Sequence, residues 1–336
     1  MEWTRGHTIG RGATATVSIA TSSSGNVFAV KSAELSRSGF LQREQKILST
    51  LSSPFVVGYI GYDITHDNTI MFDLMMEYVR YGTLVDTIHK CGGQLYESTI
   101  SLYTRQIVQG LEYLHSTGIV HCDIKGRNIL IGEDGAKISD FGCSKKVKTP
   151  VEGITDDRKA SIGGTPAFMA PEVARGEEQG FPADIWALGC TIIEMATGGS
   201  PWPNLSHPTS VLYRIALSEE LPEFPVFLSD KAKDFLSKCL RRDPKERWTA
   251  KQLLKHPFLE ELPIKVQQIR NDEAGSPTSI LEQGIWSSIN ESETLHTMNS
   301  PIQRMKRLWM NSGLKFNWNW DGSWITVRDS KEGQIS

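Results

Sequence analysis

Three short motifs in the middle of the chain constrain its fold and its chemistry more than any other feature. Residues 121–128 (His-Cys-Asp-Ile-Lys-Gly-Arg-Asn) set a carboxylate and an amide five positions apart. Residues 140–142 (Asp-Phe-Gly) put a second carboxylate twelve positions beyond the amide, and residues 170–172 (Ala-Pro-Glu) follow. Transfer of a phosphoryl group needs a carboxylate that orients the attacking hydroxyl and oxygen ligands that hold magnesium on the phosphates. The three motifs in this order therefore predict a phosphoryl-transfer site.

A glycine-rich stretch near the N-terminus fits the same chemistry. Gly10 and Gly12 lack a Cβ, so backbone N–H groups can approach phosphate oxygens closely. The stretch resembles the loop that covers the phosphates of ATP, but Ala15 stands where that pattern has its third glycine. We expect this small methyl group to stiffen the loop without abolishing binding. The predicted loop consists of Gly10, Arg11, Gly12, Ala13, Thr14, Ala15, Thr16 and Val17.

These motifs make the chain similar to the eukaryotic protein kinases, and the resemblance runs from about Trp3 to Leu259. Residues 163–172 resemble the MAP kinase kinase kinase group. The opening Met-Glu-Trp, the His-Cys-Asp triplet and the Trp-Ile-Thr-Val-Arg of residues 324–328 resemble the short plant members of that group. The resemblance implies an α+β fold with a small β-rich N-lobe and a larger helical C-lobe. It also implies ATP and Mg²⁺ as cofactors and a place in plant stress signalling.

The resemblance assigns catalytic roles to five residues. Lys31 is expected to contact the α- and β-phosphates of ATP, and Glu44, thirteen residues on, is expected to hold Lys31 in place. Asp123 corresponds to the catalytic base. Lys125 corresponds to the lysine with which serine/threonine kinases contact the γ-phosphate. Thr165 is expected to contact both Asp123 and Lys125 and to line the floor beneath the substrate hydroxyl.

Two further residues are expected to hold the metal. Asn128 and Asp140 offer an amide oxygen and a carboxylate, and Mg²⁺ prefers such hard oxygen ligands and shares them with phosphate. The adenine ring is expected to meet the backbone of the strand between the lobes. Residues of this strand are Met76, Glu77 and Val79, and side chains expected to sandwich the ring are Ile9, Val17, Ala29 and Leu130.

Five residues are interpreted as structural supports of the site. The resemblance implies that His121 stacks on Phe141 and does not transfer protons. Glu172 and Arg247 resemble a buried ion pair beneath the substrate site. Asp184 is expected to accept hydrogen bonds from backbone N–H groups of the catalytic loop.

Cys122 departs from the pattern of many kinases, which have an arginine before the catalytic aspartate. That arginine binds a phosphate on the activation segment, and a thiol cannot replace its cation. Two compatible interpretations remain. Cys122 is a small buried residue that does not affect activity, and this kinase is not switched by arginine–phosphate pairing. Thr155, Ser161 and Thr165 are the candidate phosphosites, with unmodified hydroxyls as the alternative.

The composition excludes several other classes of protein. A net charge of −3 argues against a nucleic-acid binder that works by bulk electrostatics. Five scattered cysteines without a Cys-x-x-Cys pair favour reduced thiols in the cytoplasm or the nucleus. The opening residues contain no apolar run typical of a secretory signal. The longest apolar stretch, residues 185–193, is too short to span a bilayer and predicts a buried helix.

The hydrophobic pattern predicts the order of the elements. Residues 27–31 are typical of a strand, and residues 39–51 have the spacing of a helix. From Leu84 onward the pattern is helical, and residues 230–240 predict a further helix. The predicted organisation is a kinase domain at 1–262 (N-lobe about 1–76, C-lobe about 80–262), a mostly disordered linker at 263–313, a tryptophan-rich hairpin at 314–328 and a disordered end at 329–336.

The tail is the least conventional part of the sequence. Residues 271–300 are rich in Ser, Thr, Asn and Glu, which predicts disorder. Beyond them, Phe316, Trp318 and Trp320 alternate with asparagines before Asp321-Gly322, which is a signal for a two-residue β-turn. A lone hairpin is marginally stable in water. We therefore expect the hairpin to dock on the kinase, on a partner or on a regulator.

The sequence leads to one functional hypothesis and one alternative. The hypothesis is an active serine/threonine protein kinase whose protein substrate, by resemblance, is a MAP kinase kinase. The alternative is a pseudokinase or scaffold whose tail recruits partners. A pseudokinase has usually lost at least one of five residues, and all five are present here: Lys31, Glu44, Asp123, Asn128 and Asp140.

Overall fold

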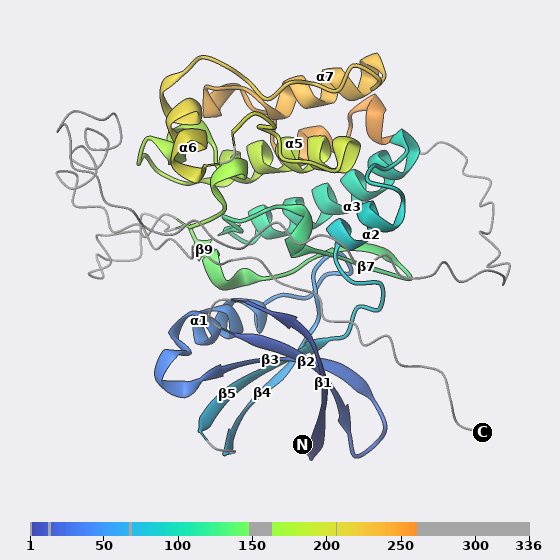
Figure 1. The fold of residues 1–336 in the computed structure, drawn as a ribbon, viewed down its shortest axis with the longest axis vertical. Coiled ribbons are helices and arrows are strands. Elements are labelled where there is room, and N and C mark those ends of the chain that lie inside the picture. Colours follow the sequence, from blue (N-terminus) through green and yellow to red (C-terminus); the bar gives the residue numbers. More distant parts are fainter. Residues whose placement is uncertain (1, 13–14, 67–68, 148–162, 206, 261–336) are drawn as a thin grey trace, which may run out of the picture. The chain divides into compact units, whose positions relative to one another are not determined.

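The computed structural model describes residues 2–12, 15–66, 69–147, 163–205 and 207–260. All of them belong to one of the two compact units into which the chain divides. In that unit the first part of the chain builds a sheet lobe, the N-lobe, and the rest builds a helical lobe, the C-lobe (Figure 1). The predicted kinase fold is confirmed. Outside the described residues lie the predicted positions Ala13, Thr14, Thr155 and Ser161, the predicted linker and the predicted hairpin.

The N-lobe is a five-stranded antiparallel sheet in the order β1-β2-β3-β5-β4. The third strand is buried along most of its length because both of its faces are covered. Helix α1 packs on one face, and the other holds a cluster of Ala20, Phe28, Val30 and Met75 with Trp3 beside it. The N-lobe elements are β1 (Trp3–Arg11), β2 (Thr16–Ser22), β3 (Val27–Glu34), the 3₁₀ turn η1 (Leu35–Arg37), α1 (Gly39–Leu48), β4 (Tyr59–His66) and β5 (Ile70–Glu77).

Helix α1 begins where the spacing predicts, at Gly39, but it ends at Leu48 and not at Leu51. The backbone N–H groups of Thr50 and Leu51 donate to carbonyls three residues back, at 3.0 Å each, so the chain tightens into turns. Leu51 stays buried all the same. Its apolar character therefore extended the helical pattern past the last turn of the helix.

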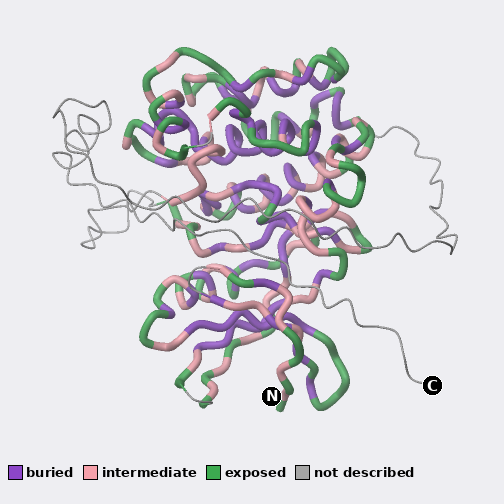
Figure 2. The backbone as a smooth tube through the Cα atoms, viewed as in Figure 1, coloured by how far each residue is buried: buried purple, intermediate pink, exposed green. Residues whose placement is uncertain are grey.

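The C-lobe is built around α5, which is buried on nearly all sides (Figure 2). A helix that is apolar all round belongs in a core. Pro182 lies in its first turn and Gly198 ends it with a φ of 68°. The C-lobe helices are α2 (Leu84–Lys90), α3 (Glu97–Ser116), α4 (Pro171–Ala174), α5 (Phe181–Thr197), α6 (Pro208–Leu217), α7 (Asp230–Cys239) and α8 (Ala250–Leu253).

Four short strands and several 3₁₀ turns interrupt the helical pattern that the sequence predicts beyond Leu84. Strands of two to four residues are too short to show a period of two in the sequence. They form the pairs β6–β9 and β7–β8, which border the motif-bearing loops. These elements are β6 (Ile119–Val120), η2 (Gly126–Asn128), β7 (Ile129–Gly132), β8 (Gly135–Ile138), η3 (Phe141–Cys143), β9 (Lys145–Lys146), η4 (Pro166–Phe168), η5 (Pro244–Glu246) and η6 (Pro257–Leu259).

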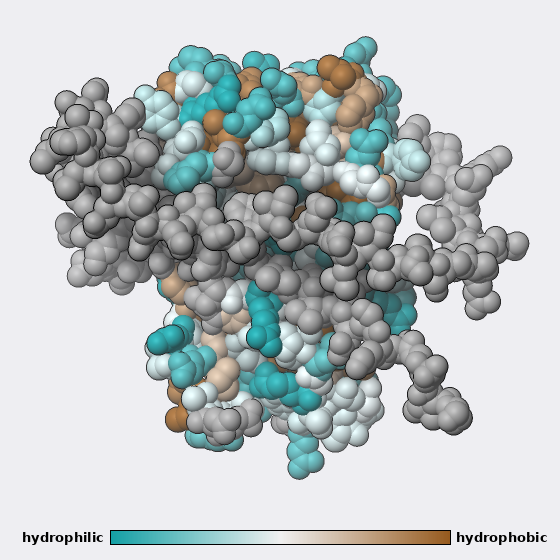
Figure 3. Space-filling model, viewed as in Figure 1, coloured by the Kyte–Doolittle hydropathy of each residue, from teal (hydrophilic) through white to brown (hydrophobic). Residues whose placement is uncertain are grey.

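The visible surface of the described residues is mostly hydrophilic or neutral, with apolar atoms in small groups (Figure 3). Within the described ranges, no helix has the length and the apolar character that crossing a bilayer requires. The longest apolar run of the sequence lies inside α5, in the middle of the C-lobe.

Candidate active site

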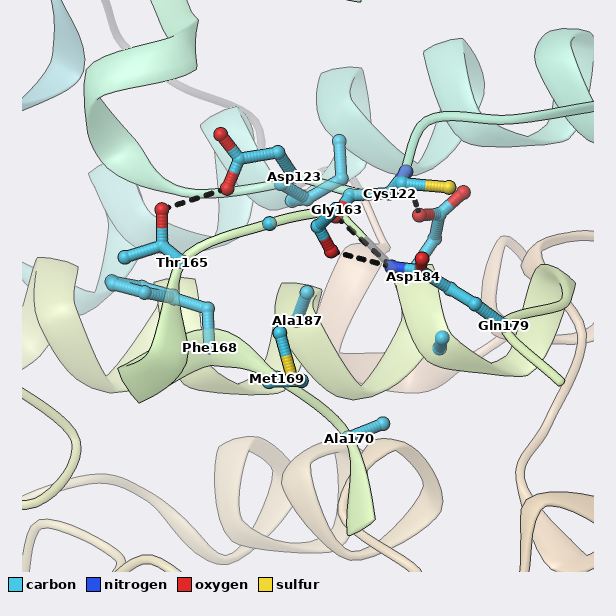
Figure 4. A pocket seen from close by; sticks show the side chains of 13 residues that line it. Cys122, Asp123, Gly163, Thr165, Phe168, Met169, Ala170, Gln179, Asp184 and Ala187 are labelled. Carbon is cyan, nitrogen blue, oxygen red and sulfur yellow. Dashed lines mark hydrogen bonds between the residues drawn. The ribbon is translucent and has the colours of Figure 1, made fainter. Parts of the chain in front are cut away.

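The loop between β6 and β7 gathers three side chains around the carboxylate of Asp123. Oδ1 of Asp123 accepts a 2.8 Å hydrogen bond from the hydroxyl of Thr165, as the dashed line in Figure 4 shows. Oδ2 accepts from Nζ of Lys125 at 2.8 Å and from Nδ2 of Asn128 at 2.9 Å. Nζ of Lys125 also lies 2.6 Å from Oγ1 of Thr165. The carboxylate is therefore fixed in position by residues from both the loop and the segment before α4.

Lys125 keeps its charge in this setting. Burial is the largest single effect and lowers its pKa, but the charge and hydrogen bond of Asp123, together with the charge of Asp140, raise the pKa above its ordinary value. The ammonium group is thus a permanent cation beside the aspartate.

A second cluster joins the two lobes. Nζ of Lys31, on β3, donates to Oε2 of Glu44 at 2.7 Å and to Oδ1 of Asp140 at 2.8 Å. Burial alone would lower the pKa of Lys31, but Asp140 and Glu44 together raise it. Burial would raise the pKa of Asp140, but Lys31 holds it well below the usual range. Burial raises the pKa of Glu44, against the effect of Lys31.

The backbone of the Asp-Phe-Gly motif is tied to the same helix. The N–H of Phe141 donates to Oε1 of Glu44 at 3.2 Å. The Phe141 ring is fully buried and meets the His121 ring edge to face, with the centroids 5.1 Å apart and the planes at 72°. One carboxylate of α1 therefore holds Lys31 with one oxygen and the motif with the other.

The amide of Asn128 is one of the two metal ligands expected from the sequence, and its oxygen is suited to bind a metal. Oδ1 of Asn128 is buried, and among the described residues it has no hydrogen-bond partner. Its Nδ2 donates to the backbone carbonyl and to Oδ2 of Asp123, so the oxygen is the part of the amide that is left for a metal. The described residues contain no cluster of three or more His, Cys, Asp or Glu that could hold a metal. One amide oxygen and one carboxylate fit Mg²⁺ that takes its remaining ligands from phosphate and water.

Asp184, at the start of α5, fixes the backbone of the catalytic loop from below. Its Oδ2 accepts from the N–H of His121 and its Oδ1 from the N–H of Cys122, both at 2.9 Å. Nε2 of His115 lies 2.9 Å from the same carboxylate. Cys122 has a φ of 70°, which is unusual for a residue with a side chain. The two hydrogen bonds from Asp184 hold the loop in this conformation.

Glu172 and Arg247 form a bidentate ion pair. The two guanidinium nitrogens Nη1 and Nη2 each lie 2.6 Å from a carboxylate oxygen, and the side chains are almost completely buried. Arg247 also donates to the carbonyls of Pro182 and Arg241, and its guanidinium lies over the Trp186 ring. The pair connects α4 to the loop before α8.

The residues expected around adenine lie on the facing strands and at the interlobe segment. Ala29 on β3 pairs with Met76 on β5, and Val17 pairs with Lys31. The side chain of Glu77 is bonded to Lys137 at 2.7 Å and to the N–H of Gly58 at 3.0 Å. The side chain is thus engaged elsewhere, and the backbone N–H of Glu77 donates to the carbonyl of Gly58 at 2.8 Å. The remaining positions are Ile9 on β1, the buried Val79 after β5, and Leu130 on β7.

In the glycine-rich loop, Gly10 pairs with Val17 across β1 and β2, and Arg11 pairs with Thr16. The N–H of Gly12 donates to the carbonyl of Ala15 at 2.9 Å. Ala15 is buried, so the residue that replaces the third glycine faces the protein and not solvent.

Two residues that matter to the loop geometry were not found from the sequence. Glu194 accepts a 2.8 Å hydrogen bond from the N–H of Gly126, where a Cβ would lie only 2.6 Å from the carboxylate. Burial raises the pKa of Glu194 to about 7, against the effects of Gly126, Arg127 and Lys125. A charge directly after the apolar run of α5 was its only signal. The other residue is Gln179, and nothing in the sequence around it indicated a role in the site.

The fold and these contacts agree with a comparison of the sequence with protein-family models. The protein kinase domain model matches residues 3–259. This range covers both lobes and the residues of the candidate site. The chain therefore belongs to the protein kinase family.

Relatives narrow the assignment. The chain is 53% identical over 299 residues to mitogen-activated protein kinase kinase kinase 17 of Arabidopsis thaliana, over 87% of this chain and 78% of the relative. It is 50% identical over 347 residues to mitogen-activated protein kinase kinase kinase 18 of the same plant, and the match covers 98% of this chain and 99% of the relative. Mitogen-activated protein kinase kinase kinase 20 of Arabidopsis thaliana is 39% identical over 348 residues, which are 98% of this chain and 100% of the relative. The predicted resemblance to short plant members of this group is confirmed.

Proposed function

We propose that this kinase transfers the γ-phosphate of ATP to a serine or threonine of a MAP kinase kinase. The observation that carries the proposal is the arrangement of Asp123, Lys125 and Thr165, which are joined to one another by hydrogen bonds of 2.6–2.8 Å. The relatives named MAP kinase kinase kinases supply the class of substrate.

In the proposed reaction, Asp123 accepts a hydrogen bond from the incoming hydroxyl and receives its proton as the new phosphate ester forms. Lys125 places a positive charge beside the transferred phosphoryl group, and ADP leaves. Lys31, held by Glu44, orients the α- and β-phosphates. Mg²⁺, when bound by Asn128 and Asp140, neutralises charge on the phosphates. The chain's contribution is thus positioning and electrostatic stabilisation.

We propose that the backbone of Glu77 and Val79 binds adenine, with Ile9, Val17, Ala29 and Leu130 along the ring and Met76 beside it. The N–H groups of residues 10–17 cover the phosphates.

Thr155, Ser161 and Thr165 remain candidate phosphosites. The kinase domain, 1–262, is followed by a linker and by a hairpin at 314–328 that binds a partner or regulator. The proposed location is the cytoplasm, with entry into the nucleus.

The test uses the full chain, radiolabelled ATP with Mg²⁺, and a MAP kinase kinase whose own catalytic lysine has been replaced. We expect label on serine or threonine of that acceptor, and we expect the Asp123→Asn variant to lose it. A pseudokinase would bind the acceptor or another partner without labelling it. Label that persists in the Asp123→Asn variant would contradict the assigned role of the aspartate.

A further inference from the structure

Gln179 lies between α4 and α5 and reaches up to the two segments that carry the reacting groups (Figure 4). It is 5% exposed. Its Nε2 donates to the carbonyl of Cys122 at 3.2 Å and to the carbonyl of Gly163 at 3.1 Å. Cys122 precedes Asp123 in the catalytic loop, and Gly163 opens the segment that leads to Thr165. One amide group therefore connects both segments from beneath.

The chemistry of the amide matches this task. An NH₂ group has two hydrogens, and here each faces one carbonyl. If the amide were turned by half a rotation, its oxygen would face two other oxygens, so the hydrogen bonds themselves fix its orientation. Oε1 is buried, and within the described ranges it has no hydrogen-bond partner. Gln179 is thus used as a double donor.

The two segments need such a donor because they approach each other very closely. Gly164 has a φ of 120°, and a Cβ on it would lie 2.6 Å from the carbonyl oxygen of Cys122. Cys122 itself has a φ of 70°. Neither conformation is favourable for an ordinary residue, so the surroundings must hold it in place. Two carbonyl oxygens that point into one small space also repel each other unless a donor lies between them.

We propose that Gln179 is a positioning residue that clamps the Thr165 segment to the catalytic loop and so shapes the surface that receives the protein substrate. The residues that follow the clamp on each side, Asp123 and Thr165, share the 2.8 Å hydrogen bond at the reaction centre. A glutamine is uncharged and needs no phosphate as a partner. The clamp therefore gives this kinase, which has Cys122 where others have an arginine, a phosphate-independent way to order the segment.

Two substitutions of similar size separate the clamp from simple packing. Gln179→Met keeps the volume and removes both donors. Gln179→Glu keeps the shape but points a carboxylate oxygen at the two carbonyls. The matched control is Gln106→Met, because Gln106 also joins backbone groups, donating to the carbonyl of Asp134 at 3.0 Å and accepting from the N–H of Ala136 at 2.8 Å. Gln106 lies away from the reaction centre.

The first measurement is hydrogen exchange of the full chain, which does not depend on kinase activity. We expect the amides of residues 163–169 to exchange at least about tenfold faster in Gln179→Met, and faster still in Gln179→Glu, because each lost hydrogen bond weakens local order. The control should leave this segment unchanged and act near residues 134–136. Equal exchange in wild type and Gln179→Met would overturn the clamp, whatever the activity of the protein.

The second measurement rests on the proposed function. With a MAP kinase kinase lacking its catalytic lysine as acceptor, we expect Gln179→Met to raise KM for the acceptor about tenfold and to leave KM for ATP within about twofold. Hydrolysis of ATP by water should also persist. Equal increases in both KM values would show a general structural role and contradict the proposal. If the wild type labels no acceptor, the proposed function is wrong. The hydrogen-exchange result alone then decides whether Gln179 clamps the two segments together.

Discussion

Glu44 holds Lys31 with one carboxylate oxygen, at 2.7 Å, and the backbone N–H of Phe141 with the other, at 3.2 Å. A single side chain of α1 therefore couples Lys31 of the N-lobe to the Asp-Phe-Gly motif of the C-lobe. A movement of α1 that carries Glu44 away from both groups would weaken both contacts. The position of α1 thus controls the whole cluster.

This coupling leads to a prediction for catalysis. Lys31→Met removes the group that positions the phosphates, and Asp140→Asn removes charge from the metal site. Each should lower turnover at least about 10²-fold, because positioning and charge stabilisation supply most of the catalysis. The measurement is initial-rate phosphorylation of a protein acceptor by the purified variants. Lys238→Met, which breaks a partly exposed ion pair with Asp234 in α7, is the control and should have little effect. Near wild-type rates in both test variants would refute the assignment.

A second prediction concerns the ion pair beneath the substrate site. Arg247→Ala leaves Glu172 buried without its partner and should cost about 3–5 kcal/mol of unfolding free energy. For a domain of this size, the melting temperature should fall by on the order of 10 °C. The control is Arg214→Ala, whose pair with Glu220 is much more exposed and should contribute under about 1 kcal/mol. Equal melting temperatures of the two variants would mean that the buried pair adds nothing.

The sequence was sufficient for the parts of the site that are encoded by local spacing. Asp123, Lys125 and Asn128 are close because they share one loop, and Lys31 and Glu44 because strand and helix are adjacent in sequence. Glu194 and Gln179 reach backbone groups 68 and 57 residues away in the chain. A contact from a side chain to a distant backbone group involves no matching side chain at the other end, although the contact of Glu194 does require the glycine at position 126. It therefore leaves no pattern that a single sequence can show.

The same reasoning explains the limits of the predicted elements. Strand β3 and helices α1 and α7 have enough residues for a period to be visible. The strands that border the catalytic loop have two to four residues each. They form because Asp184 and the Asp-Phe-Gly motif fix the loop between them, and this is a tertiary effect.

A third prediction concerns the tail, whose hairpin stays a prediction. Around a turn at residues 321–322, Phe316, Trp318 and Trp320 would share one face with Ile325 and Val327. Such an apolar surface usually marks a contact site. Deleting residues 314–336 should therefore leave phosphorylation of a generic acceptor nearly intact and change regulation or partner binding. The comparison is between full-length and truncated chains in a kinase assay and in pull-downs. Loss of generic activity would mean that the tail belongs to the catalytic core, and two unchanged assays would remove the proposed role.

The last prediction uses the carboxyl group of Glu194, whose pKa burial raises to about 7 from the ordinary value of 4.5. The folded protein keeps this proton up to about pH 7, whereas the unfolded chain loses it near pH 4.5. Between these values unfolding releases a proton, so the contribution of Glu194 to stability falls as the pH rises and is constant above pH 7. Glu194→Gln still offers an oxygen to the N–H of Gly126 but cannot ionise.

The variant should match wild type at pH 4.5 and exceed it at pH 8 by roughly 1–3 kcal/mol. The measurement is urea unfolding of both proteins at pH 4.5, 6 and 8, compared as a difference so that all other titrating groups cancel. Glu220→Gln, at a more exposed ion pair, is the control for replacing a glutamate by glutamine. A stability difference between Glu194→Gln and wild type that is the same at all three pH values would show that Glu194 ionises normally. In that case burial would not raise the pKa of Glu194.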